Sequence, residues 1–438
     1  MKQGLLQNFK LLKMPGKVHG FWVAAFFCMI FMNACYAQNP SATPKTATVD
    51  VTEKGVKPND NAGDSKAIQQ VIDQARPGTV VFFPAGKYII DAPVEINQGN
   101  ITLRGEQGAV FTFDNKTDWY AKYGTRVGMF NVCANNITID RLYLNQGFSA
   151  SGRVDGQSPL IGGIIMGCKY KKAGAVNPKN ITVTNCTVYD YYGDAISSFN
   201  VSISNFTVTN DTLISSYVVG NWKTAGTKGE QAINANSGEN IVFSNNVIRG
   251  ALDDAIAVHT NVKNLTITNN NITSTGGRIL VSGVTGGNIS GNYIEFIEDG
   301  GSAFGVIFDF ESKKLSFNND VTITNNKVFV NKGVKIVCGI RLLGAGYNVK
   351  ITDNTFETVD KQGSGIQMQD LTWQADKKKY FGDNITLSNN KFINFKTGIV
   401  KNISKNVQAP KLIIKDNEYK GADKEMETLD GSVRSFEY

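Results

Sequence analysis

The chain has 438 residues, with 44 Gly, only 10 Pro, 41% hydrophobic composition and a formal net charge of +7. A chain of this length is too long for one ordinary compact core, and no Pro/Ser-rich linker divides its middle. A repeat architecture, in which each unit contacts only its neighbours, is therefore favoured. Residues 1–37 contain four Lys and no acidic residue, so removing them would lower the charge to +3 and would weaken any case for nucleic-acid binding.

The N-terminal segment has the features of an export signal. Its Lys residues precede the apolar run Phe21 to Met32, which is too short to span a bilayer. We therefore predict a signal peptide over 1–37, a flexible lead-in over 38–52 and a β-helix domain over 53–438. The expected product is secreted or periplasmic and has no transmembrane span. A lipoprotein signal ending at Cys35 is the alternative, which would place the protein on the cell surface.

The sequence after the signal segment opens with a helix pattern. Asp64-Ser65 is an N-cap signal, Pro77-Gly78 is a stop signal, and a strand-like run from Thr79 to Ile90 follows. Apolar residues at helical spacing lie between the two signals: Ala67, Ile68, Val71, Ile72 and Ala75. Since a solenoid needs its apolar ends covered, we interpret this helix as the lid of the N-terminal end.

Cysteines after the signal segment are few and widely spaced, and none forms a CxxC pair. This pattern excludes a disulfide scaffold and a zinc site. We predict that all four are small buried hydrophobic residues: Cys133, Cys168, Cys186 and Cys338.

A short phrase returns along the chain from about residue 180. It alternates apolar and polar residues and closes on Asn, as in Ile241 to Asn246 and Val321 to Asn326. Alternation at period two predicts a strand with one buried face, and the Asn predicts a turn in the left-handed conformation. An apolar residue follows each phrase and starts a second short strand. Stacking of the phrases would place Asn over Asn at the turn.

A second ladder of apolar residues recurs at intervals of 23 to 37 residues. The shortest interval suits one coil of three short strands, and the excess in other coils is loop. Its members are Ile164, Ile196, Ile233, Ile256, Ile279, Val306, Ile340, Ile366 and Ile399. These columns predict an all-β protein: a single-stranded parallel β-helix with an N-terminal capping helix.

The opening of the domain resembles a known group. Gly55 to Asp60, the helix Ala67 to Ala75 and the run Val80 to Tyr88 resemble the start of the pectate-lyase-like superfamily. That group includes polygalacturonases, rhamnogalacturonases, several polysaccharide lyases and phage tailspike depolymerases. The coil pattern extends the resemblance over residues 52–420. It implies a right-handed parallel β-helix that binds, and usually cleaves, an acidic polysaccharide.

A narrower resemblance concerns the segment Leu252 to Thr260. Its Asp253-Asp254 looks like the paired-Asp segment of polygalacturonases, in which the pair and an Asp one coil earlier activate water and protonate the leaving oxygen. The earlier coil here reads Glu230-Gln231, and the following coil reads Gly276-Gly277-Arg278 where the family has Gly-His-Gly. The family's later Arg-Ile-Lys is missing, so the resemblance to the catalytic motifs is partial.

The columns predict a cluster of carboxylates independently of the family. Counting back from the ladder, Asp194, Gln231, Asp254 and Gly277 share one position, while Glu230 and Asp253 share the position before it. With adjacent coils about 4.8 Å apart, Glu230 lies next to Asp253, and Asp194 lies about 10 Å from Asp254. These separations include the values of inverting and of retaining hydrolases. The predicted catalytic residues are Asp254 and Asp253, supported by Glu230 or Asp194.

The residues that follow the ladder positions are expected to face outward and to contact a sugar chain. Arg278 and Lys223 are placed to meet substrate carboxylates. The other candidates are Asn234, Asn236, His259, Asp309, Arg341, Gln367 and Gln369.

Three functions are compatible with these residues. The first is hydrolysis of a uronate-containing polysaccharide, which requires no cofactor. The second is a polysaccharide lyase of the same fold, in which acidic residues hold Ca²⁺ and Arg278 takes the proton. The third is a β-helix that binds polysaccharide without catalysis, in which Asp253-Asp254 only caps backbone amides and His259 is an ordinary surface residue. The sugar, the metal requirement and the oligomeric state stay open.

Overall fold

The computed structural model describes residues 47–114, 119–123, 127–147, 161–168, 177–191, 193–198, 201–216, 218, 231–251, 253–274, 276–307, 315–373, 376–405, 407 and 410–429. The predicted signal peptide and most of the predicted lead-in lie outside these ranges. The first strand, β1 (Thr48–Asp50), starts inside the predicted lead-in, so ordered structure begins before the predicted boundary at residue 53.

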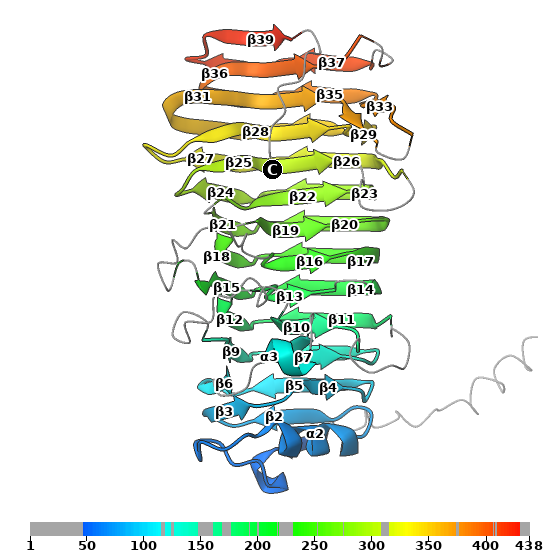
Figure 1. Ribbon diagram of the computed structural model, residues 1–438, viewed down its shortest axis with the longest axis vertical. Coiled ribbons are helices and arrows are strands. Elements are labelled where there is room, and N and C mark those ends of the chain that lie inside the picture. Colours follow the sequence, from blue (N-terminus) through cyan, green and yellow to red (C-terminus); the bar gives the residue numbers. More distant parts are fainter. Residues whose placement is uncertain are drawn as a thin grey trace, which may run out of the picture. The chain divides into compact units, whose positions relative to one another are not determined.

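The described residues form a solenoid of parallel strands, in which each coil contributes one strand to each of three faces (Figure 1). Face A contains β1, β2 (Val80–Phe83), β5 (Ile101–Gly105), β8 (Ile137–Asp140), β11 (Lys179–Thr184), β14 (Ser202–Thr209), β17 (Ser237–Ser244), β20 (Val262–Thr268), β23 (Val284–Ser290), β26 (Asn318–Thr324), β30 (Lys350–Thr352), β35 (Ile385–Ser388) and β37 (Leu412–Lys415). Two further short strands, β29 (Gly346–Tyr347) and β34 (Gly382–Asp383), join its edge.

Faces B and C follow face A in each coil. Face B contains β3 (Gly86–Ile90), β6 (Ala109–Phe113), β9 (Tyr143–Asn145), β12 (Thr187–Tyr191), β15 (Thr212–Ser215), β18 (Val247–Ala251), β21 (Asn271–Ser274), β24 (Tyr293–Phe296), β27 (Lys327–Val330) and β38 (Glu418–Lys420). Face C contains β4 (Val94–Ile96), β7 (Val127–Val132), β10 (Ile161–Met166), β13 (Ile196–Ser197), β16 (Ile233–Ala235), β19 (Asp254–Val258), β22 (Arg278–Ser282), β25 (Gly300–Ile307), β28 (Ile336–Leu343) and β39 (Lys424–Thr428). The long strands β31 (Thr355–Gln369) and β36 (Lys391–Asn402) run through both faces.

The apolar ladder of face C confirms the predicted stacking, with one correction. Ile164, Ile196, Ile233, Ile256 and Ile279 pair in succession along the coils. The next member is Phe304 and not Val306, because Phe304 pairs with Ile279 and Val306 pairs with Val281. Each ladder residue of face C that precedes Phe304 stacks inside the coil, where apolar side chains form one continuous core.

The closing Asn residues confirm both expected roles. The first Asn of a phrase adopts the left-handed conformation, with φ of 57° at Asn245 and 54° at Asn325. The second Asn is buried and forms a side-chain ladder: the Nδ2 of Asn246 donates to Asn270, that of Asn270 donates to Asn292, and that of Asn292 donates to Asn326. Buried backbone groups at this turn are thereby satisfied in every coil that carries the phrase.

The expected helix is α2 (Ser65–Gln74), which buries Ile68, Val71 and Ile72 in the main core. Its Asp64 does not cap the helix as predicted, since the Oδ2 of Asp64 accepts the backbone N–H of Ile89. The remaining helical elements are the 3₁₀ turn η1 (Thr52–Lys54) and the short α3 (Trp119–Tyr123). An antiparallel pair, β32 (Leu371–Thr372) and β33 (Lys379–Tyr380), completes the elements. Among the described segments, every helix is too short or too polar to cross a bilayer.

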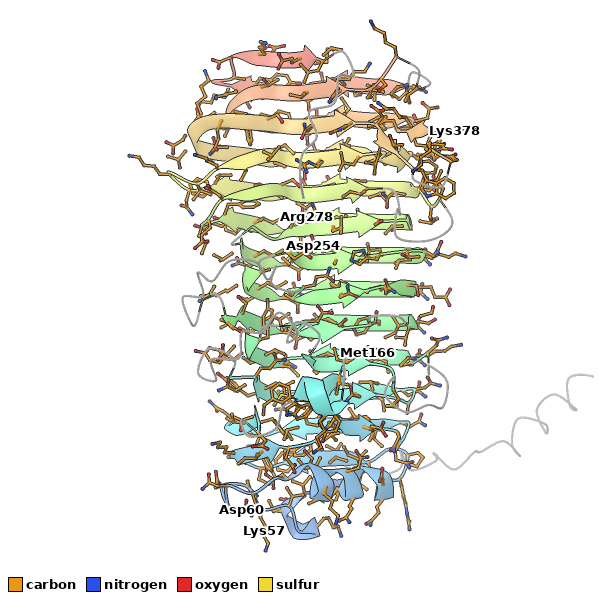
Figure 2. All side chains as sticks on the ribbon, viewed as in Figure 1. Lys57, Asp60, Met166, Asp254, Arg278 and Lys378 are labelled. Atoms are coloured by element: carbon orange, nitrogen blue, oxygen red, sulfur yellow. A yellow bond between two sulfur atoms is a disulfide. The ribbon has the colours of Figure 1, made fainter. Side chains whose placement is uncertain are left out.

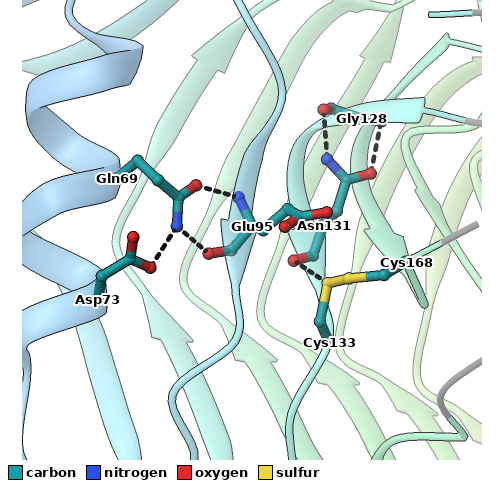
Figure 3. The surroundings of a disulfide bond; sticks show 7 residues. All are labelled: Gln69, Asp73, Glu95, Gly128, Asn131, Cys133 and Cys168. Carbon is teal, nitrogen blue, oxygen red and sulfur yellow. Dashed lines mark hydrogen bonds between the residues drawn. A yellow bond between two sulfur atoms is a disulfide. The ribbon is translucent and has the colours of Figure 1, made fainter. Parts of the chain in front are cut away.

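Two of the four cysteines correct the prediction. Cys133 and Cys168 form a disulfide at the ends of β7 and β10, on neighbouring coils of face C (Figure 3). Cys186 and Cys338 are free and buried, as predicted. Spacing could not reveal the pair, since the two residues become neighbours only when the coils stack. Gln69 of α2 bonds the backbone of Glu95 beside this disulfide, so helix, first coil and disulfide form one connected region.

Replacing both bonded cysteines, Cys133→Ser with Cys168→Ser, is expected to lower the free energy of unfolding by about 4 kcal/mol, the loop-closure value for a separation of 35 residues. Urea titration of the oxidised protein and the variant would measure this. The reduced parent protein should match the variant. A loss equal in the variant and in a Cys186→Ser control would show instead that any buried cysteine is equally sensitive.

Candidate functional site

The predicted site lies at the corner where the chain passes from face B to face C. Asp194 precedes β13, Gln231 precedes β16 and Asp254 begins β19, so the three occupy one corner on three successive coils. Backbone hydrogen bonds confirm the stacking: the N–H of Ala195 donates to Gln231, and the N–H of Ala232 donates to Asp254. Asp194 and Asp254 are therefore two coils apart, about 10 Å along the axis.

Asp254 is 2% exposed and forms an ion pair with Arg278 on the next coil, with 2.8 Å between its Oδ1 and the Arg278 Nε (Figure 2). This corrects the expected column, in which Gly277 stood beside Asp254. A register shift between Asp254 and Ile256 aligns Asp254 with Arg278 instead. Gly305 on the following coil lies against the arginine, since a Cβ there would be in van der Waals contact with the Arg278 Cδ at 3.4 Å.

Gln231 joins the other polar residues of the corner. Its backbone N–H donates to the Oδ1 of Asp194 at 3.3 Å, and its side-chain Nε2 lies 3.4 Å from the His259 Nε2. Asn234 donates from its Nδ2 to the Gln231 Oε1. Sequence reasoning placed Gln231 in the acidic column but gave it no role, and its position between two carboxylates was the signal that could have found it.

The expected outward row is largely buried. His259 and Arg341 are each 8% exposed, Gln367 is 6% exposed and Asn234 is fully buried, while Asn236 and Gln369 are half-buried. These side chains therefore lie in a recessed polar strip and not on an open surface. Polar groups at such depth need partners. Gln231 accepts from the Asn234 Nδ2 and contacts His259, whereas the Asn234 Oδ1 has no hydrogen-bond partner among the described residues.

Arg341 lies beside Cys338 on β28. Burial raises the pKa of the Cys338 thiol to about 11, against a smaller opposing effect of Arg341. The thiol is therefore protonated at neutral pH and is not a nucleophile.

The remaining predicted site residues are Glu230, Lys223, Asp309 and Asp253. Glu230, Lys223 and Asp309 lie outside the described residues. Asp253 is half-buried at the corner next to Asp254. The described carboxylates of the corner are thus Asp194, Asp253 and Asp254.

Among the described residues, the only group of three metal-ligating side chains is Glu95, Cys133 and Cys168, and two of these form the disulfide. It is separate from the corner that holds Asp254. The requirement for Ca²⁺ expected of a lyase stays a prediction.

Two family models match the sequence. The rhamnogalacturonase A/epimerase, pectate lyase-like model matches residues 48–140, and the right-handed β-helix region model matches residues 228–408. The predicted resemblance to the pectate-lyase-like group is thereby confirmed. A search of curated protein sequences finds no match.

Solved structures share the fold at low identity. The surface protein and adhesin PfbA of Streptococcus pneumoniae is 17% identical, with 87% of this chain and 100% of that chain covered and a TM-score of 0.63. DFA-IIIase from Arthrobacter chlorophenolicus A6 is 13% identical, with 89% and 100% covered and a TM-score of 0.56. The exopolygalacturonase from Thermotoga maritima is 12% identical, with 88% and 92% covered and a TM-score of 0.50. At these identities the likeness concerns the fold alone.

Proposed function

We propose that this pectate-lyase-like β-helix protein is an exported enzyme that hydrolyses an acidic, uronate-containing polysaccharide at the corner between faces B and C. The observation that carries the proposal is the buried Asp254–Arg278 ion pair on a corner that also holds Asp194 and Asp253, with His259 in contact with Gln231 of the same corner. A buried ion pair is not needed for stability, because replacing such a pair by apolar residues is often neutral or stabilising. The presence of this pair among other carboxylates therefore favours a functional role.

The geometry suggests separate roles for the carboxylates. The Arg278 Nε holds the Asp254 carboxylate in one orientation, which suits a base that activates water. Asp194 or Asp253 would protonate the leaving oxygen. The two-coil separation of Asp194 and Asp254, about 10 Å, is close to the range of inverting hydrolases, which leave room for a water molecule.

Arg278 would also recognise the substrate. Within the described part of the chain, Asp254 contacts Arg278 at its Nε, so the terminal nitrogens of Arg278 can donate two parallel hydrogen bonds to a sugar carboxylate. The same ion pair argues against the lyase alternative with Arg278 as the base, because the Arg278 Nε is engaged by Asp254, which favours a binding role.

Non-catalytic binding is the second candidate, since a β-helix of this kind occurs in PfbA, described as a surface protein and adhesin. The polar residues of the corner would then only contact sugar. Export itself depends on residues 1–37 and is part of the proposal.

The first test is product analysis with polygalacturonate, pectin, alginate and glycosaminoglycans. Hydrolysis is expected to release reducing ends without the ultraviolet absorbance of an unsaturated product, and to continue in the presence of a chelator. Absorbance that disappears with the chelator would replace the proposal by a calcium-dependent lyase. Binding without any product would leave the non-catalytic candidate.

A further inference from the structure

A cavity of about 710 Å³ opens at the N-terminal end of the same corner, away from the residues discussed so far. It lies over the ends of β3, β6 and β9 on face B. This volume falls within the usual range of small-molecule sites. The register places it about four coils from Asp254, or roughly 19 Å along the axis.

The floor of the cavity consists of two stacked columns. Ile89, Thr112 and Asn145 pair in register on β3, β6 and β9. Asp91 and Asp114 follow them by two residues on the first two coils, and both are half-buried. Carboxylates, a hydroxyl, an amide and an apolar side chain are thus presented together within the reach of one small molecule.

The wall of the cavity is residues 61–63, and hydrogen bonds hold it in place. Gly63 pairs with Ile89, and the following Ser65 donates its N–H to the Asp91 Oδ1 at 3.2 Å. Gly63 lets this wall lie close to Asp91, since a Cβ at position 63 would displace the Asp91 carboxylate. A wall fixed in this way is organised before any ligand binds, which lowers the entropic cost of binding.

Two polar groups at the cavity are left without partners among the described residues. The Lys87 side chain lines the cavity and is exposed, and no ion pair or hydrogen bond holds its ammonium. Gln146, a further lining residue, is 2% exposed, and both polar atoms of its carboxamide lack a hydrogen-bond partner. An unsatisfied buried amide costs free energy that a polar occupant would recover.

We propose that this cavity binds a neutral sugar unit. Hydroxyl groups on a sugar both donate to Asp91 and Asp114 and accept from Lys87, while the C–H face of the ring packs on Ile89. A uronate fits less well, because two of the three charged lining side chains are the carboxylates of Asp91 and Asp114, with which the nearby Lys122 ammonium already interacts. The choice of a sugar rests on the proposed function, and the polysaccharide would then contain neutral units besides uronate.

Saturation-transfer NMR of the purified protein with glucose, galactose, rhamnose and galacturonate as separate probes tests this inference. At least one neutral sugar is expected to bind more strongly than galacturonate. Thr112→Tyr, which fills the cavity from an outward position of β6, should reduce that binding at least tenfold. The matched control is Thr273→Tyr, at a half-buried Thr of β21 on the same face, and should leave binding unchanged.

The outcomes separate this inference from the proposed function. Absence of binding by any neutral sugar, equal binding by the two variants, or stronger binding of galacturonate would overturn it. Because no step of this assay requires cleavage, an inactive protein that still binds a neutral sugar through this cavity would contradict only the proposed hydrolysis. Conversely, a Thr112→Tyr protein that hydrolyses short substrates normally while the parent binds no neutral sugar would contradict only the cavity.

Discussion

Asp254→Asn is expected to lower kcat for polysaccharide cleavage by about 10³-fold, within the range of rate enhancement supplied by one positioned acid or base. The substitution keeps the shape of the side chain and leaves an oxygen that can accept from the Arg278 Nε, now 2.8 Å from the carboxylate. It removes only the charge and the basicity. The loss should therefore fall on kcat, while KM changes little.

A matched control separates catalysis from the loss of an ion pair. Asp140 on face A also accepts hydrogen bonds from arginine, at 2.9 Å from the Arg104 Nε, and its side chain is 10% exposed. Asp140→Asn should retain full kcat, and both variants should keep the circular dichroism spectrum of the parent. Normal cleavage by Asp254→Asn would refute the role of this carboxylate and would direct attention to Asp194 and Asp253.

The fold could be predicted because its determinants are local and repeated. An apolar residue at every second position defines a strand, and Asn at the turn adopts φ values near 55° that most residues avoid. The sequence of each coil therefore determines the strand and the turn of that coil. The Ile column was visible for the same reason. The pattern of a single coil fits several folds, whereas its repetition along the chain identifies a solenoid.

The errors came from register, which depends on contacts between coils. Val306 was assigned to the ladder, and most ladder residues do follow a small residue, as in Ala255-Ile256, but Ala303-Phe304 and Gly305-Val306 both fit that pattern. Only the pairing of Ile279 with Phe304 between the two coils decides for Phe304. The register shift between Asp254 and Ile256 similarly places Arg278 beside Asp254, where the sequence columns had placed Gly277.

The site was only partly accessible to sequence reasoning. The columns brought Asp194 and Asp254 to one corner, because strand stacking alone determines that neighbourhood. They could not reveal the Gln231 contacts or the Cys133–Cys168 bond, which depend on side-chain directions at turns. Nor could they reveal that the strip with His259 and Arg341 is recessed, since burial there is not encoded in the strand pattern itself.

The Asn ladder of face A leads to a prediction about stability and pH. Its first two positions are Cys186 and Asp211, and the Asp211 Oδ1 accepts the N–H of Cys186 at 2.6 Å, as each Asn does for the coil before it. Its Oδ2 is buried and finds no hydrogen-bond partner in the part of the chain that the structure describes. Burial raises the pKa of Asp211 to about 8, despite the opposing hydrogen bonds from Cys186 and Thr209.

The folded protein therefore binds a proton at Asp211 that the unfolded chain releases above its ordinary pKa of 3.8. The contribution of Asp211 to the free energy of unfolding is therefore fully present below pH 4. It falls as the pH rises towards 8, by up to about 1.4 kcal/mol per pH unit. Asp211→Asn should remove that loss, because an amide has no proton to release. Its Nδ2 would donate to the Val183 carbonyl, as the Asn246 Nδ2 donates to Val208 at 3.1 Å.

Urea titrations at pH 5 and pH 8.5 would measure the effect. The free energy of unfolding of the variant minus that of the parent is expected to be larger at pH 8.5 than at pH 5, by on the order of 4 kcal/mol. Asp353→Asn, at an exposed turn position of the same face, is the control and should show no such change. A parent protein as stable at pH 8.5 as at pH 5, with the variant unchanged, would mean that Asp211 is ionised in the folded state at both pH values.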